Sequence, residues 1–153
     1  MQYVFDRTEY DVRTAREIIA AKVRNFLVLA EKEVGILNRG TITNDTLNRI
    51  EGGLLAVKRD TDAFLYRSKI PDPVYWDNHN YFKRGDFERI LDSLDKIKDS
   101  FFYYNTTPQT PSASYHYSNI NDIERILFDF ESILEEIRAQ QAYCGDYICG
   151  SEA

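Results

Sequence analysis

The sequence predicts an all-α protein, because one short helical phrase occurs three times along the chain. The copies read Leu-Asn-Arg-Ile, Phe-Glu-Arg-Ile and Ile-Glu-Arg-Ile, with their arginines at Arg49, Arg89 and Arg125. Further apolar residues follow each copy at three- and four-residue spacing, which is the period of one helix face. We therefore expect four main helices, three of them related, joined by extended linkers rich in proline and aromatic residues.

The first helix is predicted over residues 8–34. Thr8 and Asp11 form a capping-box pair at its start, and apolar residues recur at helical spacing from Val12 to Ala30. Gly35 fits the C-cap of this helix.

The second helix is predicted over residues 43–66, with Gly52 and Gly53 in its interior. Each glycine costs about 1 kcal/mol relative to alanine. One interpretation is a close crossing or a bend at which another backbone approaches, and the alternative is a tolerated local weakness.

Two more helices are predicted over residues 85–103 and 119–140, the last with Asn121 and Glu124 as a cap-like pair. Prolines interrupt the chain before each of them, at positions 71, 73, 108 and 111. The tail, residues 141–153, carries a Gly-Asp step and β-favouring residues, so a short hairpin or a strand added to a partner's sheet is expected there, with a frayed terminus as the alternative. The predicted division is a helical domain, 1–140, and a β-like C-terminal tail, 141–153.

Composition limits the class of protein. A chain of 153 residues is long enough for one domain with its own core. A net charge of -6, with basic and acidic residues interleaved, argues against nucleic acid as a partner. The N-terminal segment lacks the pattern of a signal peptide, and no apolar run reaches membrane-spanning length, so we expect a protein made in a cytoplasm and not inserted in a membrane.

No pattern of catalytic chemistry is present. The chain lacks a Gly-rich phosphate loop and a nucleophile elbow, and its carboxylate runs are typical of solvated helix faces. Cys144 and Cys149 are too few for a zinc site, and His79 and His116 are too distant to complete one. We therefore expect a non-enzymatic protein with no cofactor, no metal and free thiols.

The repeated arginines favour a structural interpretation. We expect their stems to lie along the edge of the core while each guanidinium pairs with a carboxylate on the next helix. The alternative is that the three arginines make the same contact to repeated features of a neighbouring subunit.

Aromatic residues are unusually frequent, with 11 Tyr, 9 Phe and one Trp, and many occur in the predicted linkers and in the tail. Rings with a polar tip are favoured at protein interfaces, although any single ring is more simply core packing. The predicted partner-binding residues are Tyr75, Trp76, Tyr81, Tyr103, Tyr104, Tyr143 and Tyr147.

Several sequence words follow one another over nearly the whole chain. They are Asp6-Arg7-Thr8 with Asp11-Val12, Asp45-Thr46-Leu47-Asn48-Arg49-Ile50-Glu51, a linker with Trp76, and Asp122-Ile123-Glu124-Arg125-Ile126-Leu127 before a Gly-rich ending. In this order they resemble a family of small tail or baseplate-region proteins from phages and prophages of Gram-positive bacteria. Cys144 and Cys149 stand where that pattern tends to have serine, which argues further against a required disulfide or metal.

The resemblance implies a non-enzymatic structural or adaptor subunit of a phage tail tip or baseplate, made in the bacterial cytoplasm and carried in the virion. Its partners would be other tail or baseplate proteins, in a homo-oligomer or a hetero-complex. Two alternatives come from other classes. One is a host-recognition module in which Trp76, Tyr75 and Tyr81 form a platform for a cell-wall saccharide, and the other is a cytoplasmic regulator that binds a partner helix.

Overall fold

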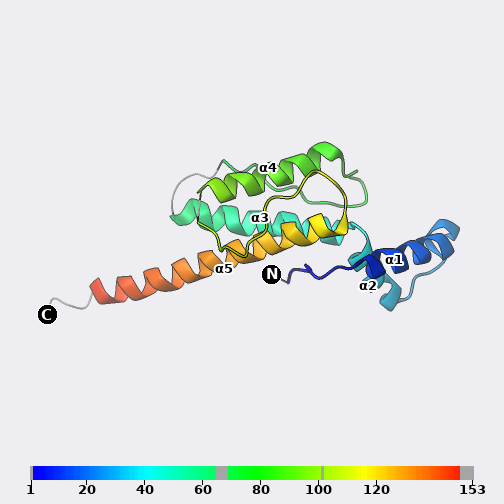
Figure 1. Ribbon diagram of the computed structural model, residues 1–153, viewed down its shortest axis with the longest axis horizontal. Coiled ribbons are helices and arrows are strands. Elements are labelled where there is room, and N and C mark those ends of the chain that lie inside the picture. Colours follow the sequence, from blue (N-terminus) through cyan, green and yellow to red (C-terminus); the bar gives the residue numbers. More distant parts are fainter. Residues whose placement is uncertain (1, 65–68, 101, 149–153) are drawn as a thin grey trace.

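The computed structural model describes residues 2–64, 69–100 and 102–148, and Figure 1 shows their arrangement. The helices are α1 (Glu9–Ala21), the 3-10 turn η1 (Val23–Asn25), α2 (Glu31–Gly40), α3 (Asn44–Phe64), α4 (Arg84–Ser100) and α5 (Tyr117–Ile148). Every regular element in this described part of the chain is a helix. The predicted all-α class is therefore confirmed.

Helices α3, α4 and α5 form a bundle in which all three run in the same direction (Figure 1). Ion pairs fix this direction for α3 and α5, because Arg49 pairs with Glu124 near the start of both helices and Asp60 pairs with Arg138 further along both. Short connections join antiparallel neighbours. Parallel helices instead require the chain to return along the bundle before each new helix.

Three extended segments make these return paths, and we call them straps: residues 2–8, 69–83 and 102–116. The first strap runs antiparallel to α5, since Tyr3 bonds to Glu131 while Arg7 bonds to Asn121. The corresponding pairs are Trp76 with Asn48 and Asp72 with Lys58 for the second strap, and Tyr104 with Glu136 and Thr107 with Asp129 for the third.

The bundle is thus built from three units of one strap followed by one helix, which matches the threefold repeat in the sequence. Only the first unit departs from this plan, because α1 and α2 are inserted between its strap and α3. These two helices fold back on each other as a hairpin that projects from one end of the bundle, while the last part of α5 projects from the other (Figure 1).

The repeated apolar residues form the core between the three helices. Those that follow the three arginines are almost fully buried: Ile50, Leu54 and Val57 on α3, Ile90, Leu94 and Ile97 on α4, and Ile126, Phe130 and Ile133 on α5. Burial of one such side chain contributes about 1.5–3 kcal/mol. The repeat therefore marks the face that each helix turns to the core.

The predicted first helix over residues 8–34 is wrong beyond Ala21. The chain leaves the helix there, Phe26 adopts a left-handed backbone conformation with φ 55°, and α2 begins at Glu31. A straight helix would have left its apolar stripe without a partner, whereas the hairpin packs Ala15 of α1 against Gly40 of α2. An added Cβ at Gly40 would overlap Ala15 and the carbonyl oxygen of Asp11. Gly35, expected as a C-cap, lies inside α2.

The close neighbours of Gly53 are side chains and not another backbone. A Cβ added there would lie 2.5 Å from the hydroxyl oxygen of Tyr3 and 3.1 Å from Cδ1 of Leu127. The approaching group is the first strap, whose Tyr3 ring lies over α3 at this point. Glycine at this position leaves room for the Tyr3 ring, which a Cβ would force to shift.

The remaining helix boundaries differ less from expectation. Helix α3 ends its described part at Phe64, and α4 ends at Ser100 rather than at residue 103. The expected cap pair of Asn121 and Glu124 is wrong, since α5 begins at Tyr117 and both side chains instead bind the first strap. The expected β-like tail is wrong up to Ile148, because the backbone hydrogen bonds of α5 continue to that residue. The rest of the tail lies outside the described residues.

Candidate functional site

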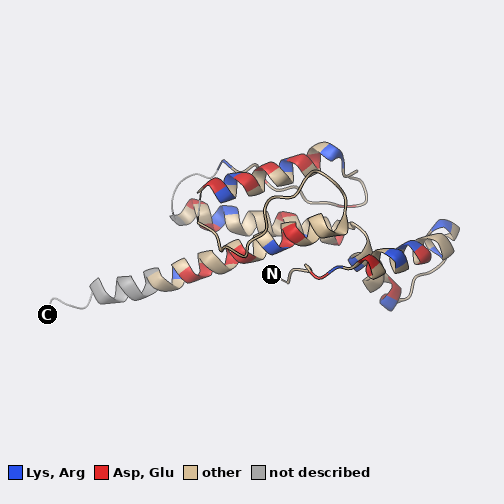
Figure 2. Ribbon diagram, in the orientation of Figure 1, with Lys and Arg blue, Asp and Glu red and all other residues tan. Residues whose placement is uncertain are grey.

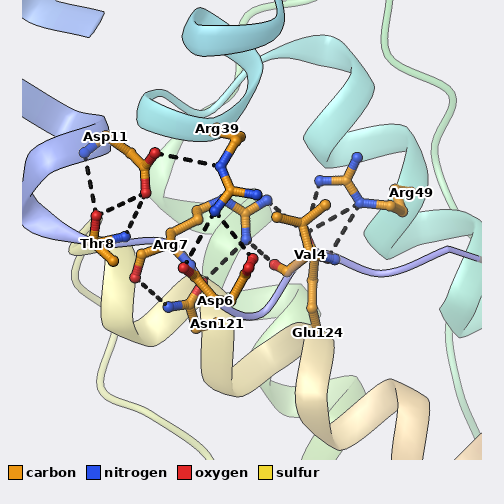
Figure 3. A network of polar contacts seen from close by, with 9 residues as sticks. All are labelled: Val4, Asp6, Arg7, Thr8, Asp11, Arg39, Arg49, Asn121 and Glu124. Atoms are coloured by element: carbon orange, nitrogen blue, oxygen red, sulfur yellow. Dashed lines mark hydrogen bonds and ion pairs between the residues drawn. The ribbon is translucent and has the colours of Figure 1, made fainter. Parts of the chain in front are cut away.

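The polar centre of the molecule is the buried carboxylate of Glu124, whose side chain has 0% exposure. Its Oε1 accepts from Nη2 of Arg7 at 2.8 Å and from Nη2 of Arg49 at 2.9 Å. The backbone N–H of Val4 donates to Oε2 (Figure 3). One carboxylate of α5 therefore joins the first strap to α3, and two guanidinium groups share it.

Arg7 is bound through its backbone and both Nη atoms, whereas its buried Nε has no hydrogen-bond partner. The side-chain amide of Asn121 accepts from the backbone N–H of Arg7 at 3.2 Å and donates to the backbone carbonyl of Arg7 at 2.9 Å (Figure 3). The two bonds resemble those that a neighbouring β-strand would make. Burial lowers the pKa of Arg7, and the adjacent Glu124 opposes that shift. The buried guanidinium consequently depends on Glu124 for its stability.

A second network ties the hairpin to the same strap. Thr8 and Asp11 form the expected capping box of α1, with the backbone N–H of Thr8 donating to Asp11 at 2.8 Å. Arg39 of α2 donates to Asp11 at 3.3 Å and pairs with Asp6 (Figure 3). Burial raises the pKa of Asp11, but the bonds from Thr8 and Arg39 outweigh it and lower the pKa overall.

Glu51 of α3 is the centre of a matching arrangement. Its carboxylate accepts from the backbone N–H of Val74 at 3.2 Å and from the indole N–H of Trp76 at 3.2 Å, both in the second strap. The guanidinium of Arg89 on α4 completes the set.

Asp129 of α5 is the third buried carboxylate of this kind. The hydroxyl of Thr107 in the third strap donates to it at 2.6 Å, and Nε of Arg125 approaches to 3.1 Å. Arg125 also lies over the rings of Phe5 and Phe128.

These three sets share one plan, and we call them carboxylate clamps. In each clamp, one strap and one repeated arginine bind the same buried carboxylate. The arginine lies on the helix that comes after that strap in the chain: Arg49 on α3 after the first strap and the hairpin, Arg89 on α4 after the second strap, and Arg125 on α5 after the third. The predicted pairing with a neighbouring helix is correct for Arg49 and Arg89. It is wrong for Arg125, which pairs with Asp129 one turn along its own helix and lies over the Phe5 and Phe128 rings.

The clamps hold the straps against the helices. Each carboxylate is buried and is engaged by at least two donors of the chain itself. Among the described residues, no group of three His, Cys, Asp or Glu side chains is placed to hold a metal ion. None of the described helices combines the length and apolar composition needed to cross a bilayer.

The predicted partner-binding aromatics fall into different environments. Tyr75 and Tyr81 are 76% and 84% exposed, whereas Trp76 between them is only 3% exposed. The prediction that Trp76 faces a partner is wrong, because Glu51 binds its indole N–H and Phe82 packs edge-on against its ring.

The later aromatics are partly engaged or not described. Tyr103 is half-exposed and packs against Phe130, and the hydroxyl of Tyr104 donates to Glu136 at 2.9 Å, which raises the pKa of Tyr104. Tyr143 and Tyr147 lie on α5, but their side chains are outside the described residues.

The most exposed apolar group of the described chain lies at the end of the α1–α2 hairpin, where the sequence pattern predicts continuous helix. Phe26 is 97% and Val28 90% exposed, and Val23 and Leu27 are also exposed. We call these four residues the hairpin tip. The left-handed backbone of Phe26 is rare for a bulky residue, and it directs the chain away from the helix axis at this point.

A pocket of about 530 Å³ separates the hairpin from the start of α5. Apolar side chains such as Val12, Ile19 and Ile120 line it together with Arg7 and Arg39. Both arginines are already paired with carboxylates. Glu9, Arg16 and His116 also line the pocket, so its wall is mixed in character.

No family model, curated protein or solved structure matches the chain.

Proposed function

We propose that this protein is a non-enzymatic structural or adaptor subunit that acts by docking to other proteins. The observation that carries the proposal is the inserted α1–α2 hairpin, which interrupts the strap-and-helix plan and ends in the exposed hairpin tip. Adjacent apolar side chains that a folded domain leaves exposed are typical of interaction sites.

The carboxylate clamps support the same proposal from the interior. Buried ion pairs contribute little net stability compared with apolar packing, but they fix which elements lie together. Here they hold the straps, and the first one also holds the base of the hairpin. A bundle clamped in this way is a rigid platform on which the hairpin is displayed.

The finer assignment is a subunit of a phage tail tip or baseplate, located in the virion. It is supported by the ordered sequence words from Asp6 to Leu127 and by the helical architecture, which fits a small assembly component. The saccharide-binding alternative depends on a platform formed by the rings of Tyr75, Trp76 and Tyr81. Trp76 is buried, so the central ring of that platform is missing from the surface.

The test is to mix the purified protein with the tail proteins encoded beside its gene and to measure absolute mass by light scattering after gel filtration. A stable complex of defined stoichiometry is expected. If the protein joins none of them and is missing from purified particles, the tail assignment is refuted. A complex lost on Phe26→Ser with Val28→Ser, but kept on Leu55→Ser, would identify the hairpin tip as the docking element.

A further inference from the structure

The pocket between the hairpin and the start of α5, which we call the hairpin pocket, has one side of α1 as a wall. The α1 residues that line it are Glu9, Val12, Arg16 and Ile19. Their three- and four-residue spacing places all four on the same side of the helix. Ala15, which meets Gly40 of α2, lies on a neighbouring side. This side of α1 is therefore left open to the pocket.

The opposite wall comes from the junction of the third strap with α5. Tyr115 is half-exposed there, and the ring centroids of His116 and Tyr117 lie 4.4 Å apart. Ile42, which packs against the core, and the buried Ile120 also line the pocket. A volume of about 530 Å³ with apolar and aromatic walls is within the range of small-molecule sites.

Three guanidinium groups line the hairpin pocket, those of Arg7, Arg16 and Arg39, against the single carboxylate of Glu9. The acids that pair with the first and the last of these arginines (Figure 3) are Asp6, Asp11 and Glu124. They balance the charge of those two arginines from outside the pocket lining. Arg16 differs, because it is exposed and no acid of the described chain pairs with it.

Glu9 lies too far from Arg16 to form an ion pair with it. The two residues are seven positions apart on α1, which separates them by about 10 Å along the helix axis. Glu9 is also in the first turn, where the positive end of the helix offsets a negative charge. Figure 2 shows the acidic start of α1 beside the bundle and basic positions further along the helix. The hairpin pocket therefore joins an apolar and aromatic interior to an unpaired cation.

From these observations we propose that the hairpin pocket binds a small amphipathic carboxylate, a molecule with an apolar or aromatic body and one carboxylate group. The body would lie among Val12, Ile42 and Ile120, between the two walls. The carboxylate would pair with Arg16, whose planar guanidinium can bind both oxygens at once. This site is separate from the hairpin tip, so it adds a ligand to the proposed docking function and does not depend on it.

Isothermal titration calorimetry of the full chain with three eight-carbon probes tests the charge preference. Octanoate, octanamide and octylammonium share one apolar tail and differ in the charge of the head group. We expect octanoate to bind about tenfold more tightly than the other two, because only its head group can pair with Arg16. Equal binding of octanamide would overturn the proposal, and so would a preference for octylammonium, which would assign the dominant charge to Glu9.

Substitution of Arg16 tests the residue that selects the anion. Arg16→Gln should weaken octanoate binding about tenfold and leave octanamide binding unchanged. The matched control is Arg13→Gln, since Arg13 is exposed on the same helix but lies over the Tyr10 ring and not in the pocket lining. It should leave octanoate binding unchanged. An Arg16→Gln variant that binds octanoate like the original chain would overturn the proposal.

Two measurements locate the bound probe. Phe26→Ser with Val28→Ser should leave octanoate binding unchanged, and loss of binding in this variant would assign the probe to the hairpin tip. Nuclear Overhauser contacts between the octanoate methylenes and the rings of Tyr115 and Tyr117 should appear in the original chain, which needs no substitution. Binding of octanoate without these contacts would place it outside the hairpin pocket and overturn the proposal.

Discussion

Substitution of Glu124 by glutamine tests whether the first carboxylate clamp holds the fold together. The change keeps the size of the side chain but removes the charge shared by Arg7 and Arg49, and its amide N–H₂ would face donors. Removing one partner of a buried ion pair costs about 3–5 kcal/mol. The Arg7 side chain is almost fully buried and Arg49 mostly so, so this range applies without a large discount for solvent. Since small domains have only about 5–15 kcal/mol of stability, the loss should be a large part of the total.

The matched control is Glu88→Gln, because Glu88 precedes Arg89 as Glu124 precedes Arg125 in the repeated phrase. Glu88 is exposed and pairs with the exposed Arg84, so the expected cost is below about 1 kcal/mol. Urea unfolding followed by far-ultraviolet circular dichroism measures both. The reasoning is refuted if the two variants lose the same stability. A double-mutant cycle with Arg49→Gln should show coupling of about 0.5–3 kcal/mol with Glu124→Gln.

Three other predictions follow from the core and the first strap. Gly53→Ala should lower the free energy of unfolding by about 1–3 kcal/mol in urea, despite the better helix propensity of alanine, because the new Cβ meets the Tyr3 hydroxyl and Leu127. Tyr3→Phe should reduce that cost, and an unchanged cost would contradict the geometry. Burial, followed by the bond to Glu131, raises the pKa of Tyr3, so the folded protein holds the phenol proton more tightly than the unfolded chain. The resulting contribution of Tyr3 to the free energy of unfolding is complete below about pH 10 and is lost as the pH rises above that value. The alkaline loss of stability should therefore be smaller in Tyr3→Phe. The single Trp76 should emit at short wavelength and resist quenching by iodide until the protein unfolds, whereas strong quenching of the native protein would place its ring at the surface.

The sequence alone predicts the bundle because the relevant signals are local. Helical periodicity at Ile50, Ile90 and Ile126 reports which face is buried, whatever the partner helix is. The capping box of Thr8 and Asp11 is similarly visible in four consecutive residues.

The parallel direction of the helices and the clamps depend on contacts between distant residues. Glu124 and Glu88 occupy the same place in the repeated phrase, yet one is buried beneath a strap and the other is exposed. The helical pattern also continues past Ala21, since no proline or glycine marks the break there. Only the consecutive apolar residues from Phe26 to Leu29, which do not fit a single helix face, carry a signal of that turn.

The first strap gives the chain a particular order of folding. The bond between Tyr3 and Glu131 joins residues 128 positions apart, and the clamp at Glu124 spans nearly as much of the chain. As the ribosome releases the chain from its N-terminus, α1 and α2 have all their mutual contacts early, whereas Arg7 waits for α5. Contacts so distant in sequence form slowly. We therefore expect the hairpin to be formed and exposed on the nascent chain well before the bundle behind it closes.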